Sequence, residues 1–310
     1  MNELNSSNQT KLVGLDKYIL ELISLFNKNR LPSKILLSGP KGIGKSTLAY
    51  HFINYILSLD EEFKYDLEKF QINENCRTFK TIQNKSNLNF TLIDIDDDKK
   101  FIDINQIRDL ILNLSKSSFN NKPRFVLIDN IEFLNTNSVN ALLKILEEPT
   151  KNVYFILINN NKRILSTLTS RCINFKISLT HNNCLEISNK LLNDQLNNLI
   201  NKDLINFYLT PGNIFKLIKF GEINNYDLMK INLNQLLIKI IEEHQYKKYK
   251  GLKFLFFDLI EYYFRSLNDT FSSRVHEKYS YFLKRISDTK RFNLDEESLF
   301  IEFKEKVLNG

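Results

Sequence analysis

The sequence predicts an α/β fold for the first 178 residues, built on a parallel sheet with helices on both faces, and an α-helical second half. Three observations predict it. Short apolar runs alternate with longer helical stretches, a glycine-rich loop joins the first run to a helix, and the apolar spacing becomes helical after about residue 180. Parallel strands covered on both faces are continuous apolar runs, so a sheet is expected first and helices after it.

Five segments have the length and apolar character of buried strands. They are KILLS (34–38), FTLIDI (90–95), RFVLID (124–129), VYFILI (153–158) and INFKI (173–177). Between them, Asp103 precedes a helix with one apolar stripe, and Asn137 precedes a second helix that Pro149 ends. This alternation of strand and helix predicts that all five strands belong to one parallel sheet.

The second half contains turn signals between segments of helical spacing. TPGN (210–213) is expected to form a turn between two helices, and FGEINNYD (220–227) to link them to a last helical unit. The aromatic run FLFFDLIEYYF (254–264) has the spacing of a packed helix, and base stacking is the alternative. The predicted domains are 1–178, 179–225 and 226–310.

The composition excludes several classes of protein. No run of about 18 apolar residues could cross a membrane, and the N-terminal segment lacks the apolar stretch of a signal peptide, so a soluble cytoplasmic protein is expected. The three cysteines form no C-x-x-C pair, which predicts reduced thiols and no zinc site. The net charge of +7 could favour a polyanionic partner, but the lysines are spread along the whole chain.

The segment LLSGPKGIGKSTLAY (36–50) contains the pattern G-x-x-x-x-G-K-[ST]. Glycines allow successive backbone N–H groups to turn toward phosphate oxygens, and the following helix offers its positive end. Lys45 is expected to reach the β- and γ-phosphates, and Ser46 to bind Mg²⁺. The predicted nucleotide-binding residues of the loop are Gly39, Gly42, Gly44, Lys45, Ser46 and Thr47. The alternative is a decayed loop that is kept only for the fold.

A metal site in such a loop needs an acidic residue at the end of a neighbouring strand. Asp129 ends the third strand and is the predicted second Mg²⁺ ligand, although an aspartate there can also simply cap a turn. Asn130 follows it and cannot accept a proton from water, and Glu132 lies beyond the expected strand end, so the general base of a hydrolase is expected to be missing. The acidic run DIDDDKK (94–100) is interpreted as a solvated loop rather than a metal cluster.

The chain resembles the AAA+ clamp-loader family of bacterial DNA polymerase III over about residues 10–178. The resemblance is carried by the phosphate loop with the helices around it, by RFVLIDNIEFLNTNSVNALLKILEEPT and by VYFILINNNKRILSTLTSRCINFKI. Its most specific part is NALLKILEEPT followed twenty residues later by SRC. The helical remainder matches the family only in its layout.

The resemblance implies an AAA+ nucleotide-binding domain, a helical lid and a helical collar that joins the subunits of a hetero-pentameric ring. Such a ring opens the sliding clamp and places it on primed DNA. Arg171, in SRC, matches the family's arginine finger, which acts in trans on a neighbouring subunit's ATP. The family's polar sensor of the γ-phosphate would be Asn159 or Asn160, with Asn160 preferred, unless these residues only form a loop.

The chain departs from the hydrolysing subunits of the family. Those subunits carry a glutamate where Asn130 stands, an arginine in the lid where Ile214 and Phe215 stand, and four zinc-binding cysteines where only Cys76 occurs. The resemblance therefore implies a subunit that binds ATP and Mg²⁺ with little hydrolysis of its own. The alternatives are a hydrolysing motor of the same ring and, more distantly, a P-loop nucleotide kinase.

Overall fold

The computed structural model describes most of the chain. The described residues are 5–96, 99, 101–116, 120–147, 152–205, 209–249, 252–267, 273–292 and 294–308. The chain folds as two compact units. The first comprises Met1–Ile187 with Thr210–Gly212, and the second comprises Ser188–Leu209 with Asn213–Gly310. Among the described residues, no helix combines the length and the apolar character that a membrane crossing needs.

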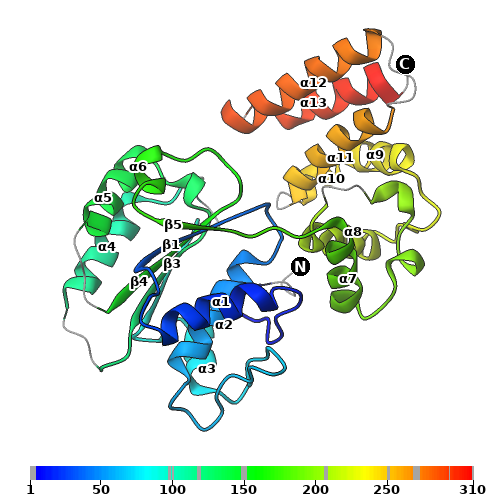
Figure 1. Cartoon of the computed structure of the whole chain (residues 1–310). Coiled ribbons are helices and arrows are strands. Elements are labelled where there is room, and N and C mark those ends of the chain that lie inside the picture. Colours follow the sequence, from blue (N-terminus) through cyan, green and yellow to red (C-terminus); the bar gives the residue numbers. More distant parts are fainter. Residues whose placement is uncertain are drawn as a thin grey trace. The chain divides into compact units, whose positions relative to one another are not determined.

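The first unit contains a five-stranded parallel sheet with the order β2-β3-β4-β1-β5 (Figure 1). The strands are β1 Lys34–Ser38, β2 Phe90–Ile93, β3 Arg124–Ile128, β4 Val153–Asn159 and β5 Ile173–Lys176. All five predicted strands are present. The second ends two residues earlier than predicted because Asp94 turns the chain, its Oδ1 accepting a hydrogen bond from the backbone N–H of Ile95 at 2.7 Å.

Helices cover both faces of this sheet (Figure 1). The helices α1 Asp16–Asn27, α2 Lys45–Leu57 and α3 Arg77–Gln83 pack on one face. The helices α4 Ile104–Ser115, α5 Thr136–Glu147 and α6 Ser166–Thr169 pack on the other face. Successive strand residues enter opposite cores, as the pleat requires: Phe125 joins the first core, and Val126 joins the second.

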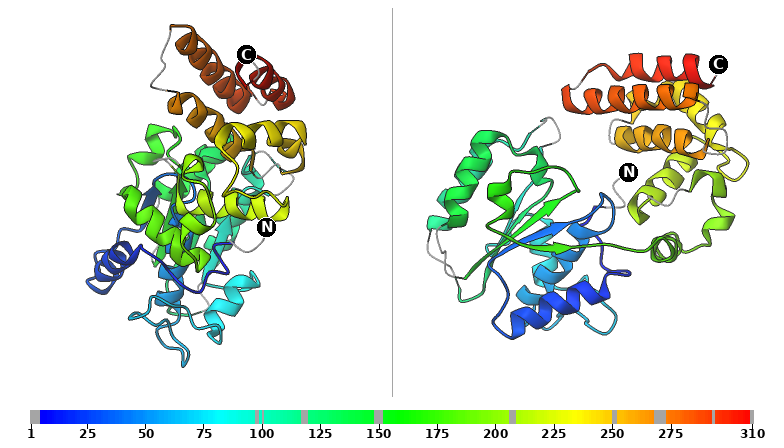
Figure 2. Two further views of the ribbon diagram at one scale, coloured as in Figure 1. Left: turned by 90° about the vertical axis from the view of Figure 1, so that its right-hand side faces the viewer. Right: turned by 45° about the horizontal axis from the view of Figure 1, so that its top comes forward.

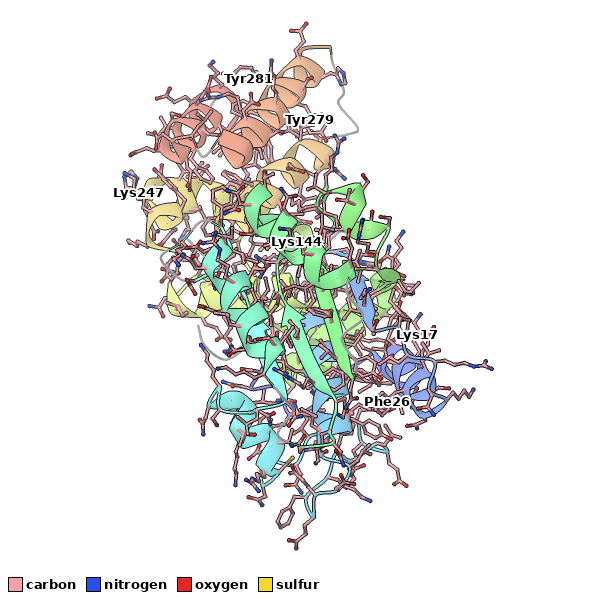
Figure 3. The ribbon with its side chains drawn as sticks, turned by 90° about the vertical axis from the view of Figure 1, so that its left-hand side faces the viewer. Lys17, Phe26, Lys144, Lys247, Tyr279 and Tyr281 are labelled. Atoms are coloured by element: carbon pink, nitrogen blue, oxygen red, sulfur yellow. The ribbon has the colours of Figure 1, made fainter. Side chains whose placement is uncertain are left out.

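The outer surfaces of α1 and α5 carry charged residues, as the amphipathic pattern predicts. Figure 3 shows Lys17 on α1 and Lys144 on α5, both of them exposed. Phe26, on α1, instead packs edge-on against Phe52 of α2 with ring centroids 6.5 Å apart. In α1 and α5 the apolar side of the helix therefore faces the core and the polar side faces solvent, whereas α2 is buried on most of its sides.

The helix starts are partly as predicted. Asp103 caps α4 in a capping box with Gln106, as its position indicates. The prediction for α5 is wrong by two residues, because the helix begins at Thr136 and the side chain that accepts the hydrogen bond of Ser138 N–H, at 2.8 Å, belongs to Asn135. Pro149, the predicted end of this helix, lies outside the described residues.

The described residues after Lys176 contain helices and no strand, as predicted. These helices are α7 His181–Leu192, α8 Pro211–Ile223, α9 Leu233–Glu242, α10 Gln245–Lys248, α11 Lys253–Ser266, α12 Ser273–Phe292 and α13 Glu296–Phe303. Two short 3-10 helices, Leu196–Asn198 and Lys202–Leu204, and a short π-helix, Lys304–Leu308, complete the described elements of this part. TPGN does not form a turn between helices, because Pro211 begins α8, a position at which its missing N–H costs nothing.

The second unit has an aromatic core. Tyr246 and Phe300 stack with ring centroids 4.5 Å apart, and Phe257 stacks on Phe300 at 5.5 Å. The aromatic run at 254–264 lies in α11, and its Phe256 and Phe257 are fully buried, so packing and not base stacking explains it. Figure 2 shows α12 and α13 side by side within this unit. The boundary between a lid and a collar domain stays a prediction.

Candidate nucleotide-binding site

The glycine-rich loop joins the end of β1 to the start of α2, as predicted. Gly44 is the residue before α2 and has φ +99°, a conformation that side chains rarely adopt. Gly39 is required for a different reason, because a Cβ atom there would lie 2.4 Å from the backbone oxygen of Ile177. Thr47 follows in the first turn of α2. The backbone therefore has the course that brings N–H groups and the helix N-terminus to one place.

The side chain of Lys45 closes this loop from inside. Its Nζ donates hydrogen bonds to the backbone oxygens of Gly39 at 2.9 Å and Pro40 at 2.7 Å, and to Oδ1 of Asn160 at 2.9 Å. Burial lowers the pKa of Lys45 to about 8, and the negative charge of Asp129 opposes that shift. All three N–H donors of the ammonium group are thus used within the chain. In a nucleotide complex, phosphate oxygens would replace these acceptor oxygens.

Ser46 and Asp129 meet, as the sequence predicts. The Oγ of Ser46 donates a hydrogen bond to Oδ2 of Asp129, and the two oxygens are 2.5 Å apart. Burial raises the pKa of Asp129 to about 6, against the lowering effect of this hydrogen bond. A hydroxyl and a carboxylate are the hard oxygen ligands that Mg²⁺ prefers, and a desolvated carboxyl group gains from a nearby cation. These two residues fit the predicted metal.

Mg²⁺ needs only one or two protein ligands, since it keeps waters and binds the phosphates of the nucleotide. Within the described part of the chain, no three His, Cys, Asp or Glu side chains gather as a metal cluster. The three cysteines, Cys76, Cys172 and Cys184, are buried, and none of them is joined to another by a disulfide bond. That these thiols are reduced stays a prediction.

Asn130 and Glu132 both lie at the site. Asn130 lies two residues after the end of β3 and has φ +54°. Glu132 lies beyond the strand end, as predicted, in the short helix Ile131–Phe133. The side-chain N–H groups of Asn160 donate to Oδ1 of Asn130 at 2.9 Å and to Oε1 of Glu132 at 2.8 Å. The residue after Asp129 is thus an amide, which cannot act as a general base, and the nearby carboxylate of Glu132 accepts a hydrogen bond from Asn160.

The sequence left Asn159 and Asn160 as alternatives for the residue beside the phosphates. The side chain of Asn159 bonds to the backbone of Lys162, donating to its oxygen at 3.0 Å and accepting from its N–H at 3.1 Å. Asn160 instead contacts Lys45. The structure therefore brings Asn160, and not Asn159, to the site.

Arg171 lies between α6 and β5. Its guanidinium group donates hydrogen bonds to Oε1 of Glu147 at 2.5 Å and to the backbone oxygen of Thr167 at 2.9 Å. About a third of the side chain is exposed. The described contacts thus hold the guanidinium group of Arg171 against α5 and α6, and the residue is not among those gathered around Lys45.

Asp94 is a further residue of the site, although the sequence alone predicts that it is part of a solvated loop. That interpretation is wrong for this residue, because its Oδ1 accepts a hydrogen bond from Nδ2 of Asn130 at 2.8 Å. Asp97, Asp98 and Lys100 of the same run lie outside the described residues. A signal was present, since Asp94 follows a strand of a parallel sheet, and such sheets gather their functional residues at the carboxyl ends of the strands.

A glycine-rich loop between a strand and a helix, a lysine enclosed by that loop and a serine–aspartate pair at a neighbouring strand end define an α/β P-loop fold of the AAA+ type. The family model described as DNA polymerase III, delta subunit, matches residues 14–181, which is more than half of the chain. The chain belongs to this family.

The curated relatives are named as different subunits of DNA polymerase III. The DNA polymerase III subunit delta′ of Buchnera aphidicola subsp. Acyrthosiphon pisum is 24% identical over 285 residues, covering 86% of this chain and 83% of the relative. The subunit gamma of Buchnera aphidicola subsp. Schizaphis graminum is 30% identical over 171 residues, covering 54% of this chain and 44% of the relative. For several of these relatives the chain spans less than half of the relative's length.

A solved structure is similar over most of the chain but only loosely. The gamma subunit-related protein of Thermotoga maritima has 17% sequence identity and a TM-score of 0.43, with 91% of this chain and 96% of that chain covered.

Proposed function

We propose that this chain is a delta-prime-like subunit of the DNA polymerase III clamp loader, which holds ATP with Mg²⁺ and hydrolyses it slowly or not at all. The observation that carries the proposal is an intact phosphate loop beside Asn130. The loop, Lys45 and the pair of Ser46 and Asp129 supply what binding needs. The position after Asp129 supplies an amide where hydrolysis needs a base.

In the proposed complex the glycine loop and the N-terminus of α2 bind the phosphates, and Lys45 moves its donors from backbone oxygens to phosphate oxygens. Ser46 and Asp129 hold Mg²⁺, which offsets the phosphate charge. Glu132 is the one carboxylate that could replace the missing base. Its bond to Asn160 keeps that carboxylate directed at an amide, which disfavours this role.

The contribution of the chain to hydrolysis is made in trans. An arginine can meet two phosphate oxygens with its planar fork, and Arg171 stands in the SRC segment of this family. Its pairing with the half-exposed Glu147 leaves it free to exchange partners, because an exposed ion pair contributes at most about 1 kcal/mol. A neighbouring subunit's γ-phosphate, more highly charged than one carboxylate, is the proposed partner.

The proposed partners are the gamma or tau and delta subunits of a hetero-pentameric ring, and through the ring the sliding clamp and primed DNA. Relatives named as delta-prime, gamma and tau subunits support membership of that complex. The proposed location is the cytoplasm, where the chromosome is replicated. In the proposed domain organisation, residues 1–178 bind the nucleotide, residues 179–225 form a helical lid and residues 226–310 form the collar that joins the subunits.

A hydrolysing motor subunit is the second candidate. The 30% identity to a gamma subunit and the presence of Glu132 within the site favour it. The two candidates differ in turnover by the chain alone. The test is to measure ATP affinity by equilibrium titration and turnover by phosphate release on the same purified chain, with Lys45→Ala as the binding-deficient control.

The proposal predicts ATP affinity that Lys45→Ala abolishes, together with turnover near the background of that variant. Turnover at about 1 per second or faster, lost in Lys45→Ala, would establish the motor and overturn the holding site. Phosphorylation of a small acceptor would instead indicate a nucleotide kinase.

A further inference from the structure

A line of hydrogen bonds crosses the carboxyl ends of four neighbouring strands. It starts at Lys45 after β1, passes to Asn160 after β4 at 2.9 Å, continues to Asn130 after β3 at 2.9 Å and ends on Asp94 after β2 at 2.8 Å. Strand order alone makes these residues neighbours, since β1, β4, β3 and β2 are adjacent in that sequence. Glu132 is connected to this line because its Oε1 accepts a hydrogen bond from Nδ2 of Asn160 at 2.8 Å.

The direction of every bond in this line is fixed by its ends. Lys45 can only donate, so Asn160 must turn its Oδ1 toward Lys45 and its Nδ2 away from it. Asp94 and Glu132, as carboxylates, can only accept. Asn130 must therefore give Nδ2 to Asp94 and keep Oδ1 for Asn160. Amide orientation is assigned here by chemistry, and no other arrangement satisfies all the partners.

The consequence concerns Asn160. Both hydrogens of its Nδ2 are used, one by Asn130 and one by Glu132, and its backbone N–H lies 3.4 Å from Oε2 of Glu132. The side of Asn160 next to Lys45 is an oxygen. Because Lys45 is the residue that reaches the β- and γ-phosphates, Asn160 presents an acceptor, and not a donor, to that place.

We infer that Asp94 and Glu132 are positioning residues of the nucleotide site that together hold Asn160 as a hydrogen-bond acceptor, so that this amide does not distinguish ATP from ADP. Asp94 acts through Asn130, and Glu132 acts directly. To donate to a γ-phosphate, Asn160 would have to rotate its amide and lose both of its acceptors. The inference rests on the proposed nucleotide binding and specifies which phosphate groups the site senses.

Asp94 is itself held for this role. Its Oδ1 also accepts from the N–H of Ile95 at 2.7 Å, and its backbone oxygen accepts from Nε2 of Gln106 on α4 at 3.0 Å. Gln106 belongs to the capping box of α4, with its Oε1 on the N–H of Asp103 at 2.9 Å. The end of the line is thus anchored to a helix terminus and does not depend on a free loop.

The test is a double-mutant cycle of Asp94→Ala and Glu132→Ala, which removes both acceptors, read as the ratio of ATP to ADP affinity with magnesium present. Each single change removes one negative charge but leaves the other carboxylate to fix Asn160. If the two changes acted only through charge, the ratio of ATP to ADP affinity in the double variant would change by the product of the two single effects. Only the double variant frees Asn160 to rotate and donate to the γ-phosphate.

We expect the ratio in the double variant to exceed the product of the single effects by about tenfold, the effect of one hydrogen bond to a charged group. Adding Asn160→Ala to the double variant should remove that excess. A ratio equal to the product of the single effects would overturn the inference while leaving the proposed binding intact. Failure of the wild-type chain to bind either nucleotide would overturn the proposed function and this inference with it.

A second measurement serves if the double variant does not fold, as judged by circular dichroism. In the otherwise unchanged chain, Asn160→Ala should alter the affinities for ATP and ADP by the same factor. A selective loss of ATP affinity of about tenfold would show that Asn160 donates to the γ-phosphate and would contradict the inference.

Discussion

Acidification is expected to destabilise the first unit through His51, a buried residue of α2. Its Nε2 lies 3.0 Å from the backbone oxygen of Gln9, which can only accept, so Nε2 carries the proton. Its Nδ1 lies 3.0 Å from the hydroxyl of Tyr65 and accepts from it. The ring is fully buried and neutral, and burial lowers the pKa of His51 to about 4 from about 6.5.

The sign and size of the effect follow from proton binding. Below pH 6.5 the unfolded chain protonates His51 and the folded chain does not, so stability is lost as the pH falls from about 6.5 to about 4. At pH 5 the loss is about 2 kcal/mol, and below pH 4 it levels off near 3 kcal/mol. Other titrating groups add their own terms, which a matched variant cancels.

The matched variant is His51→Gln, whose amide can donate to Gln9 and accept from Tyr65 without titrating. The assay is urea unfolding followed by circular dichroism at pH 7.5, 6 and 5, for wild type and variant. The gap between the two free energies of unfolding should change by about 2 kcal/mol in favour of the variant at pH 5. Parallel pH profiles would refute the reasoning, because they would show that His51 titrates alike in the folded and unfolded chain.

Three further predictions concern the loop, the metal and the second core. Gly39→Ala should lower both the melting temperature and ATP affinity, because its Cβ would press on the backbone oxygen of Ile177; unchanged affinity by titration would contradict the loop geometry. Asp129→Asn should abolish the gain in ATP affinity that magnesium gives, measured with and without EDTA; a retained gain would place the metal elsewhere. Phe300→Ala should cost about 3 to 5 kcal/mol in urea unfolding, since Phe300 is fully buried between Tyr246 and Phe257; a loss below about 1 kcal/mol would mean that this stack is not a core.

Much of the fold could be predicted because its signals are local. The five strands are continuous apolar runs, and the loop pattern fixes what lies between the first strand and its helix. The meeting of Ser46 and Asp129 could also be predicted, because a loop residue and a strand end at the same edge of a parallel sheet must lie close together. Pattern and topology were sufficient for these features.

The sequence did not predict features for which several residues or conformations are locally compatible. Asn135 and Asn137 could each cap α5, and only the backbone course decides for Asn135. Pro211 is as compatible with a turn as with the first residue of a helix. The side chains of Asp94 and Asn130 are 36 positions apart in the sequence, and their contact follows from the pairing of β2 with β3 and not from any local pattern.

In the proposed function, the chain promotes ATP hydrolysis in a neighbouring subunit and not in its own loop. The most direct measurement is ATP turnover by the reconstituted clamp loader, with primed DNA and clamp, assembled with Arg171→Ala, Arg171→Lys or Lys45→Ala. We predict that both Arg171 variants lower turnover strongly, since a lysine keeps the charge but not the fork, and that Lys45→Ala lowers it much less. A larger loss with Lys45→Ala than with Arg171→Ala would contradict the account and identify the chain as a motor.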